Sequence, residues 1–252
     1  MSRLPEGTGP WRGAGRLGVV IPARDEEELL PSCLRALTVA AEECRSPVRV
    51  VVVADRCTDR TVEVARAAGA EVLDSRCDGG NVGAARGVGV RWLLAEAARA
   101  GVPPELVWVA STDADSTVPP DWLTLHDTAA ESGVDALVGT VAVGDWAGFP
   151  PDVVAMFEGR YTAWKGAGPS AVHPHVHGAN LGVRGSAYLA CGGFPSVPVS
   201  EDVALVLGLE ALGAPILRTP ASPVLTSARR RPRAQGGFGS VLEGLAPERS
   251  RG

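Results

Sequence analysis

Residues 106–115 read Leu-Val-Trp-Val-Ala-Ser-Thr-Asp-Ala-Asp, so an apolar run ends in two carboxylates one residue apart. The apolar run predicts a buried strand, and Val118-Pro119-Pro120-Asp121-Trp122 after it predicts the start of a helix. In open α/β sheets, ligands bind at the carboxyl ends of strands, where Asp113 and Asp115 would stand. A divalent cation would relieve the repulsion between the two carboxylates and bridge to substrate phosphates. In isolation, the same residues are also typical of an Asp-rich turn before a helix.

The chain before this stretch alternates strands and helices. Strands are predicted at residues 17–21, 48–53 and 70–73, and the second is nearly continuous in valine, as is typical of a parallel strand buried on both faces. Glu26, Glu27 and Glu28 would occupy the first turn of a helix. Helices are predicted from apolar residues at helical spacing: Leu34, Leu37 and Cys44; Val62, Ala65 and Ala68, between a cap at Thr58 or Asp59 and Gly69; Val88, Trp92 and Ala95. This βαβαβ order predicts the mononucleotide-binding half of a doubly wound sheet.

Several well-known site motifs are missing from the sequence. Pro22-Ala23-Arg24-Asp25-Glu26 follows the first strand, where a dinucleotide-binding protein would carry G-x-G-x-x-G. A nicotinamide or flavin dehydrogenase is therefore disfavoured. The sequence also contains no P-loop and no G-x-S-x-G elbow.

The chain after Asp115 continues this pattern and then changes. A helix from Pro119 to Ser132 and a fifth strand at residues 136–143 are predicted, followed by Gly- and Pro-rich loops around a helix near 152–165. We interpret residues 144–200 as acceptor-facing structure added to the sheet. A further helix is predicted from Ser200-Glu201-Asp202, with these residues on its apolar face: Leu205, Leu209 and Leu212. The basic cluster of Arg229, Arg230, Arg231 and Arg233 indicates either a solvated loop or a partner for a diphosphate.

Three histidines alternate with other residues in His173-Pro174-His175-Val176-His177. If this segment is extended, alternation places the three imidazoles on one face, a geometry that could bind zinc or copper. Because Pro174 breaks a regular strand, we favour a polar binding wall over a metal site. His177 precedes Gly178-Ala179-Asn180 and is the histidine we expect to contact a ligand.

The composition limits the partners and the compartment. The 252 residues carry a net charge of −5 and are 45% hydrophobic, which is typical of a globular protein and excludes the overall basic charge of a nucleic-acid-binding one. No apolar run approaches the roughly 18 residues that span a bilayer, and residues 1–16 contain no secretory signal. Five cysteines without a CxxC pair indicate reduced thiols in a cytoplasmic protein. Peripheral attachment to a membrane through a local basic patch stays open.

Six motifs then follow one another in an order that carries more weight than any one of them. They are Val-Ile-Pro-x-x-Asp-Glu-Glu at 20–27, a strand with Asp-x-x-Thr-Asp-x-Thr at 55–61, Gly-Ala-Ala-Arg at 83–86, Asp-Ala-Asp at 113–115, Gly-Ala-Asn-Leu at 178–181 with Cys-Gly-Gly-Phe at 191–194, and Ser-Glu-Asp at 200–202. This succession resembles the family 2 glycosyltransferases over roughly residues 17–235. The resemblance implies an α/β GT-A fold, which is a single domain with a Rossmann-like, nucleotide-binding mixed sheet flanked by helices.

The resemblance also implies boundaries and roles. Residues 1–15 would be a flexible leader, 16–115 the nucleotide-binding half, 116–235 the acceptor half and 236–252 a flexible tail. The nucleotide or substrate would contact Pro22, Ala23, Asp25, Glu26, Asp55, Arg86, Asp113, Gly178, Ala179, Asn180 and Glu201. Asp115 would bind Mn²⁺ or Mg²⁺, with Asp113 as a possible further ligand, and Asp202 would be the general base. His177, Arg229, Arg230 and Arg233 are further candidates.

The implied reaction moves a sugar from a nucleotide-diphosphate donor, expected to be a UDP-sugar, to the hydroxyl of a small or lipid-linked acceptor, with inversion. Two departures from the family pattern matter: Ala54-Asp55-Arg56-Cys57 stands where Asp-Asp-Gly-Ser is usual, and Asp25 stands where Asn is usual. The Gln-x-x-Arg-Trp motif of processive synthases is absent. A nucleotidyltransferase that makes nucleotide-sugars, and a degenerate GT-A domain that only binds them, stay open as alternatives, as does the oligomeric state.

Overall fold

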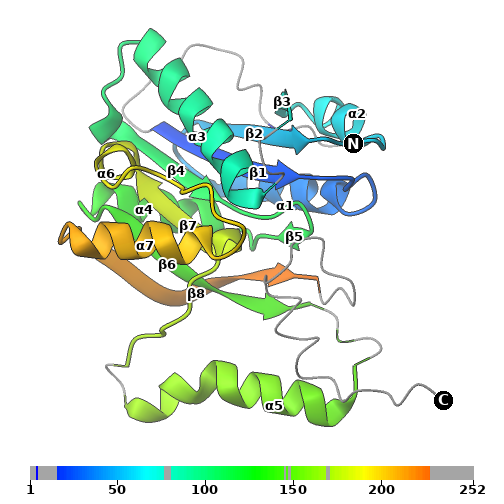
Figure 1. Cartoon of the computed structure of the whole chain (residues 1–252), viewed down its shortest axis with the longest axis vertical. Helices are drawn as coiled ribbons and strands as arrows, with labels where there is room; N and C mark the ends of the chain where they lie inside the picture. The colour runs from blue at the N-terminus through cyan, green and yellow to red at the C-terminus, as the bar shows by residue number, and fades with distance from the viewer. Residues whose placement is uncertain are drawn as a thin grey trace.

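The computed structural model describes Leu4 and residues 16–76, 81–144, 146, 149–168 and 171–227. These residues form one mixed sheet with the strand order β3-β2-β1-β4-β7-β6-β8-β5 (Figure 1). The strands are β1 (Arg16–Ala23), β2 (Val48–Asp55), β3 (Glu71–Ser75), β4 (Val107–Ser111), β5 (Ser116–Thr117), β6 (Ala136–Val143), β7 (Leu181–Arg184) and β8 (Ile216–Thr226). The predicted α/β class and the mixed sheet are confirmed.

The parallel strands bring three strand ends to one edge of the sheet. β1 pairs in parallel with β2 on one side and with β4 on the other, and β2 pairs in parallel with β3. The register sets Ala23 opposite Ala54 and Val20 opposite Ser111, so the loops after β1, β2 and β4 leave the sheet side by side. The arrowheads of β1, β2 and β8 accordingly point the same way in Figure 1. This carboxyl edge is where an open α/β sheet binds ligands.

The valine-rich strands pack helices on both faces. Val50 and Val52 belong to one hydrophobic cluster and Val51 and Val53 to the other, because successive side chains of a strand point to opposite faces. The first cluster is covered by α1 (Leu30–Glu43), α2 (Thr61–Ala67) and α4 (Trp122–Glu131), and the second by α3 (Val82–Arg99), α6 (Gly185–Ala190) and α7 (Glu201–Ala211). In Figure 1, α3, α6 and α7 lie in front of the sheet, whereas α5 (Pro151–Thr162) lies apart at the bottom of the view.

The buried face of α3 differs from the predicted one. The helix buries Ala85, Val90 and Leu93, whereas Val88, Trp92 and Ala95 are only partly buried. The reason is the glycines: a Cβ added at Gly89 would lie 2.5 Å from Val20 Cγ1, so the small residues of α3 face β1 and let the helix lie close to the sheet. A similar correction holds for α7, where Leu205 and Leu209 are buried as predicted but Leu212, at the C-cap, is exposed.

Two helices begin later than the sequence predicts. α1 begins at Leu30, so Glu26, Glu27 and Glu28 lie in the turn before it and not in its first turn. Glu27 is engaged elsewhere, because its Oε2 accepts hydrogen bonds from Arg60 N at 3.1 Å and from Arg60 Nε at 3.0 Å. α4 begins at Trp122 and not at Pro119. The predicted end of α2 is confirmed, since Gly69 follows it with φ +88°.

The interpretation of residues 144–200 as an addition to the sheet is wrong for four of them. Leu181-Gly182-Val183-Arg184 forms β7, which lies in the middle of the sheet and runs antiparallel to both β4 and β6. Four residues that include a glycine are too few to show an alternation of apolar and polar side chains, so the sequence does not predict this strand. The glycine is required there because a Cβ at Gly182 would lie 2.5 Å from His126 Nδ1 and 2.8 Å from Trp108.

Little of the predicted leader and tail lies within the described residues. Leu4 is the exception: it is buried, and its N–H donates to Ala68 O at 3.1 Å, so this residue packs against the end of α2. The tail from residue 228 onward lies outside the described residues. Among the helices of the described part of the chain, none has the length and apolar character needed to cross a membrane.

Candidate active site

The loops after β1 and β2 are tied to each other at the carboxyl edge. Asp25, with φ +52°, accepts hydrogen bonds at Oδ1 from Thr58 N (2.7 Å) and Thr58 Oγ1 (3.1 Å). Glu26 N donates to Thr61 Oγ1 at 2.7 Å, and both Glu26 and Asp55 are buried. Pro22 and Ala23 end β1 beside Asp55. These predicted nucleotide-contacting residues therefore lie close together at the carboxyl edge, where the Asp25 carboxylate and the Glu26 N–H tie the two loops to each other.

Asp113 and Asp115 diverge after β4. Asp113 pairs through Oδ1 with Arg86 of α3, and its backbone oxygen accepts from the thiol of Cys33 at 3.4 Å. Burial, aided by Asp115 and Asp113, raises the pKa of Cys33, which keeps the thiol protonated beneath this loop. Asp115 instead faces β8: its Oδ2 accepts from Ser227 Oγ at 2.9 Å. Asp113 is thus held by α3, and Asp115 by the residue that follows β8.

Arg86 lies at the centre of the site and not at its surface. Its side chain forms ion pairs with Asp113 and Glu201, its Nε donates to Ser111 Oγ at 3.1 Å, and the residue is 3% exposed. Burial alone would lower the pKa of Arg86, but Asp113 and Glu201 more than reverse this, and the pKa is raised. In this structure protein groups enclose the guanidinium of Arg86, and its predicted approach to the nucleotide stays a prediction.

The first turn of α7 presents the Glu-Asp pair in opposite directions. Glu201 is buried against Arg86, and burial raises its pKa while Arg86 opposes the rise. Asp202 is half-buried; its Oδ2 accepts from Gly178 N at 2.7 Å and its Oδ1 from Val203 N at 2.8 Å. The preceding residue, Ser200, has φ +62°, a strained backbone that tertiary contacts must hold. Asp202 is therefore a carboxylate fixed at a helix start beside the Gly-Ala-Asn segment.

The Gly-Ala-Asn segment delivers its backbone to the site but not the Asn180 side chain. Asn180 is fully buried; its Oδ1 accepts from Trp122 Nε1 at 2.8 Å, and its Nδ2 donates to Thr140 O at 2.8 Å and to Ser222 O at 3.1 Å. The Asn180 side chain therefore has a structural role here, and the contact of Asn180 with substrate stays a prediction. Gly178 N, in contrast, meets Asp202, and the buried Ala179 packs beneath it in the core.

The three histidines stack on one face, as alternation predicts. Neighbouring rings are 6.1 Å apart, and each Nε2 has a protein partner: Val138 O for His173, Tyr161 O for His175 and Tyr161 Oη for His177. Burial lowers the pKa of His177 to about 4, although Asp202 acts in the opposite direction. His177 is therefore neutral at physiological pH. The stack forms a wall beside Asp202, which suits the favoured interpretation better than a zinc or copper site.

Potential metal ligands occur at two places along the edge. Among the described residues, the side chains of Asp25, Cys57 and Asp59 are the set of three close enough to share one ion. Three of their oxygens already accept hydrogen bonds, from Thr58, Thr61 and Glu27. Burial raises the pKa of Cys57, so the thiolate form is disfavoured. Asp115, surrounded by the hydroxyls of Ser116 and Ser227, supplies the oxygen ligands that Mn²⁺ and Mg²⁺ prefer. Its donor set fits the expected ion better.

Some functional contacts escaped the sequence analysis. Ser111, Ser227 and Tyr161 touch Arg86, Asp115 and His177, but a lone serine or tyrosine has no pattern by which it could be found. The close contact of Gly83 with Glu201 could have been suspected, since Gly83 belongs to the same motif as Arg86. The remaining candidates, Arg229, Arg230 and Arg233, lie outside the described residues.

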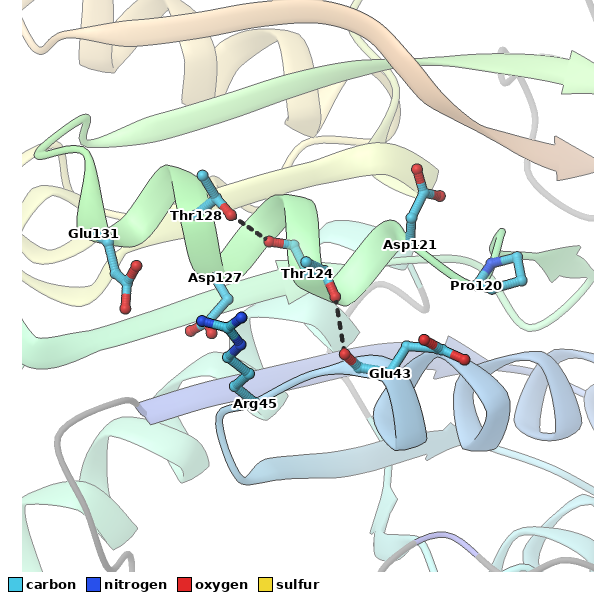
Figure 2. Close-up of a pocket in the computed structure, with 8 residues that line it drawn as sticks. All are labelled: Glu43, Arg45, Pro120, Asp121, Thr124, Asp127, Thr128 and Glu131. Atoms are coloured by element: carbon cyan, nitrogen blue, oxygen red, sulfur yellow. Dashed lines mark hydrogen bonds between the residues drawn. The ribbon is translucent and has the colours of Figure 1, made fainter.

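One further cavity, of about 530 Å³, lies away from these residues. Figure 2 shows it between the last turn of α1 and α4, lined by Glu43, Arg45, Pro120, Asp121, Thr124, Asp127, Thr128 and Glu131. Thr124 Oγ1 donates to Glu43 O at 3.3 Å and Ser46 Oγ to Asp127 Oδ1 at 2.6 Å, so the two helices contact each other there. None of the predicted site residues lines this cavity, which we regard as a gap between helices.

Comparison with known proteins places these observations in context. Residues 18–175, more than half of the chain, match the family model described as glycosyl transferase family 2. The matched region contains Asp113 and Asp115 but ends before Gly178 and Asp202. No curated protein matches the sequence.

Several solved structures are similar to this one. They include S. aureus TarS residues 1–349 with UDP-GlcNAc (TM-score 0.59, 18% identity, 88% of this chain and 61% of that chain), the Pyrobaculum calidifontis mannosyltransferase PcManGT with GDP-Man and Mn²⁺ (0.58, 19%, 91% and 60%), and Mycobacterium tuberculosis glucosyl-3-phosphoglycerate synthase with Mn²⁺, UDP and glucosyl-3-phosphoglycerate (0.54, 17%, 86% and 73%). At these identities the likeness shows the fold, which is GT-A. The chain spans about three fifths of the length of the first two.

Proposed function

The chain belongs to glycosyl transferase family 2, and we propose that it transfers a sugar from a nucleotide-diphosphate donor to an acceptor hydroxyl. One observation carries the proposal. Asp113 and Asp115 at the end of β4 and Asp202 at the start of α7 stand at the same edge, joined through Arg86 and Glu201. Displacement of a diphosphate needs charge neutralisation on one side of the sugar and a base on the other, and this edge offers both.

The donor would bind along the loops after β1 and β2, in the nucleotide-binding half. The nucleoside would contact Pro22, Ala23, Asp25, Glu26 and Asp55. The ribose would contact Asp113 through Oδ2, since Oδ1 is paired with Arg86. A UDP-sugar is the proposed donor. Similar structures are described with UDP-GlcNAc and with UDP, but one is described with GDP-Man, so both bases belong in the test.

Asp115 would hold a Mn²⁺ or Mg²⁺ ion together with the diphosphate. Such ions bind through one or two carboxylates plus substrate phosphates and keep several waters, which the half-buried Asp115 with its neighbouring hydroxyls can accommodate. When bound, the ion would neutralise charge on the departing diphosphate. Arg229, Arg230 and Arg233 are proposed to assist from the following segment.

Asp202 would act as the general base. It would take the proton of the acceptor hydroxyl while that oxygen forms a bond to the anomeric carbon. The bond from this carbon to the diphosphate oxygen would break on the opposite face, and its electron pair would leave with the diphosphate, which inverts the configuration. The hydrogen bonds from Gly178 N and Val203 N orient the carboxylate for this task.

The acceptor would enter from the side of His177 and the half formed by residues 116–235. The stacked imidazoles and Tyr161 give this side a polar wall in which His177 is neutral at pH 7. Such a wall suits a hydroxyl-bearing acceptor, either a small molecule or a lipid-linked one. We further propose a cytoplasmic location, since the described cysteines are free thiols.

Metal removal tests the proposal at Asp115. With UDP- and GDP-sugars as donors, turnover should disappear on treatment with EDTA and return with Mn²⁺ or Mg²⁺, and Asp115→Asn should lower it by about 100-fold or more. Full activity of Asp115→Asn would refute the metal assignment. Release of pyrophosphate from a nucleoside triphosphate, without donor turnover, would show a nucleotidyltransferase instead.

A further inference from the structure

Residues from three of the six motifs meet Ser111 of β4 in one buried group of charged and polar side chains, which we call the Arg86 cluster: Arg86, Ser111, Asp113 and Glu201. The guanidinium lies between the two carboxylates and also donates to Ser111 Oγ. Arg86 and Glu201 are almost completely buried, whereas Asp113 keeps 34% of its side chain exposed. The cluster therefore reaches from the interior to the carboxyl edge at Asp113 alone.

Two motif glycines make room for this cluster. A Cβ added at Gly83, three residues before Arg86, would lie 2.7 Å from the Cβ and Cγ atoms of Glu201. A Cβ added at Gly178 would overlap the guanidinium of Arg86. Atoms this close cannot coexist, so both glycines are needed where α3 and the Gly-Ala-Asn segment approach the ion pairs.

The contacts of Arg86 leave it unsuited to hold a phosphate. Its Nε donates to Ser111, its Nη1 to Glu201 and its Nη2 to Asp113. Three of the five guanidinium N–H groups are thereby used, and because Arg86 is only 3% exposed, a bound diphosphate could not reach the other two without displacing protein groups around it.

Asp202 is attached to the Arg86 cluster from two sides. Through the chain, it follows Glu201 directly in the first turn of α7. Through space, its Oδ2 accepts from Gly178 N, and Gly178 lies against Arg86. On the other side of the cluster, Asp113 belongs to the loop that carries Asp115. Arg86 is thus the shared support of the base and of the metal-binding loop.

We propose that Arg86 and Glu201 are positioning residues that fix Asp202 relative to the Asp113–Asp115 loop, with Gly83 and Gly178 as the small residues that make this support possible. The inference rests on the proposed function for the role of Asp202. A buried ion pair contributes little net stability but fixes geometry, and the planar guanidinium fork, held by two carboxylates, defines direction as well as distance. Misplacement of a reacting group by about 1 Å can cost about 100-fold in rate.

The test compares Glu201→Gln and Arg86→Lys with wild type. Glu201→Gln keeps the size and an acceptor oxygen but removes the charge, and Arg86→Lys keeps the charge but removes the fork. We expect kcat with UDP- or GDP-sugar donors to fall by about 100-fold in each variant. The Kd of UDP in the presence of Mn²⁺ should change by less than about threefold in Glu201→Gln, because this variant keeps the ion pair between Arg86 and Asp113. A Kd of UDP that weakens in step with kcat in Glu201→Gln would show that the Arg86 cluster acts through donor binding and would overturn the proposal, as would an unchanged kcat.

Arg184→Lys is the matched control. Arg184 is also a largely buried arginine, paired with Asp135 and with the backbone oxygens of Ala130 and Val134, but it lies at the opposite end of β7. Its replacement should lower Tm to a similar extent and leave kcat unchanged. A comparable loss of kcat in Arg184→Lys would mean that lost stability, and not lost positioning, explains the effect.

Hydrogen exchange separates this proposal from the proposed function. The amides of Gly178 and Val203 donate to Asp202, so their exchange should accelerate by about tenfold or more in Glu201→Gln, with no change in Arg184→Lys. This result is expected even if wild type turns over none of the donors, which would contradict only the proposed function. Unchanged protection of both amides in Glu201→Gln would contradict the positioning role.

Discussion

Asp113 and Asp115 are separated by one residue in the chain but have different surroundings. Asp113 is drawn towards α3 by Arg86, and Asp115 is drawn towards the end of β8 by Ser227. Two carboxylates on one loop thus have different partners, an arginine for Asp113 and a serine hydroxyl for Asp115, and this difference is the basis of the separate roles proposed for them.

The side chain of Asn180 gives a prediction about stability. Asn180→Ala would leave Trp122 Nε1, Thr140 O and Ser222 O without their buried partner, at roughly 1 kcal/mol or more for each group. We expect the free energy of unfolding, measured in urea, to fall by about 3 kcal/mol. Thr128→Ala on the exposed side of α4 is the control and should change it by less than about 0.5 kcal/mol. A loss below about 1 kcal/mol in Asn180→Ala would contradict the structural role.

His126 gives a prediction about pH. It is fully buried, accepts from Trp108 Nε1 at 3.1 Å, and burial lowers its pKa from 6.5 to about 3. Between pH 6.5 and 3, His126 is therefore protonated in the unfolded chain but not in the folded protein, so stability is lost as the pH falls through this window. Between pH 7 and pH 4.5, His126 should lower the free energy of unfolding by about 2.5 kcal/mol.

The measurement is urea unfolding of wild type and of His126→Asn, which keeps an acceptor for Trp108. The stability difference between the two proteins should shrink by about 2.5 kcal/mol as the pH is lowered from 7 to 4.5, since Asn does not titrate. A difference that stays constant with pH would show that His126 is not excluded from protonation in the folded state.

At the scale of helices and strands, close approach depends on glycine. α3 packs on β1 through Gly89, and β7 passes beneath α4 at Gly182. β2 was predictable because its run of valines supplies side chains to two hydrophobic clusters. β7 and the buried face of α3 were not predictable, because their close contacts occur at glycines, which have no side chain and so do not contribute to a pattern of apolar residues.

A pair of glycine substitutions tests this packing. Gly89→Ala should destabilise the protein by about 1–3 kcal/mol, because the added Cβ meets Val20 at 2.5 Å and Val53 at 3.0 Å. The matched change Gly159→Ala in α5, where no atom lies within 4 Å of the added Cβ, should stabilise it by about 0.5–1 kcal/mol, because Ala favours a helix over Gly. Equal effects of the two changes on Tm would contradict the close packing of α3.

For the molecule as a whole, the fold and its family were predictable from the order of short motifs along the chain. The site was predictable only in part. The sequence placed Asp25, Asp55, Asp113 and Asp202 at strand and helix ends, where they are, because local patterns define those ends. It did not reveal that the side chains of Arg86 and Asn180 are buried, because such burial depends on partners that are distant in sequence: 115 residues separate Arg86 from Glu201, and 58 separate Trp122 from Asn180.

Mass spectrometry of donor consumption tests the central claim, glycosyl transfer based on Asp202, most directly. Wild type, Asp202→Asn and the Arg184→Lys control would each be incubated with a panel of UDP- and GDP-sugars, Mn²⁺ and a broad set of hydroxyl acceptors. The account predicts that wild type and the control consume one donor and release its nucleoside diphosphate, whereas Asp202→Asn binds UDP or GDP as before but turns over at least about 1000-fold more slowly. Equal donor consumption by wild type and Asp202→Asn, or binding by wild type without turnover across the whole panel, would contradict it.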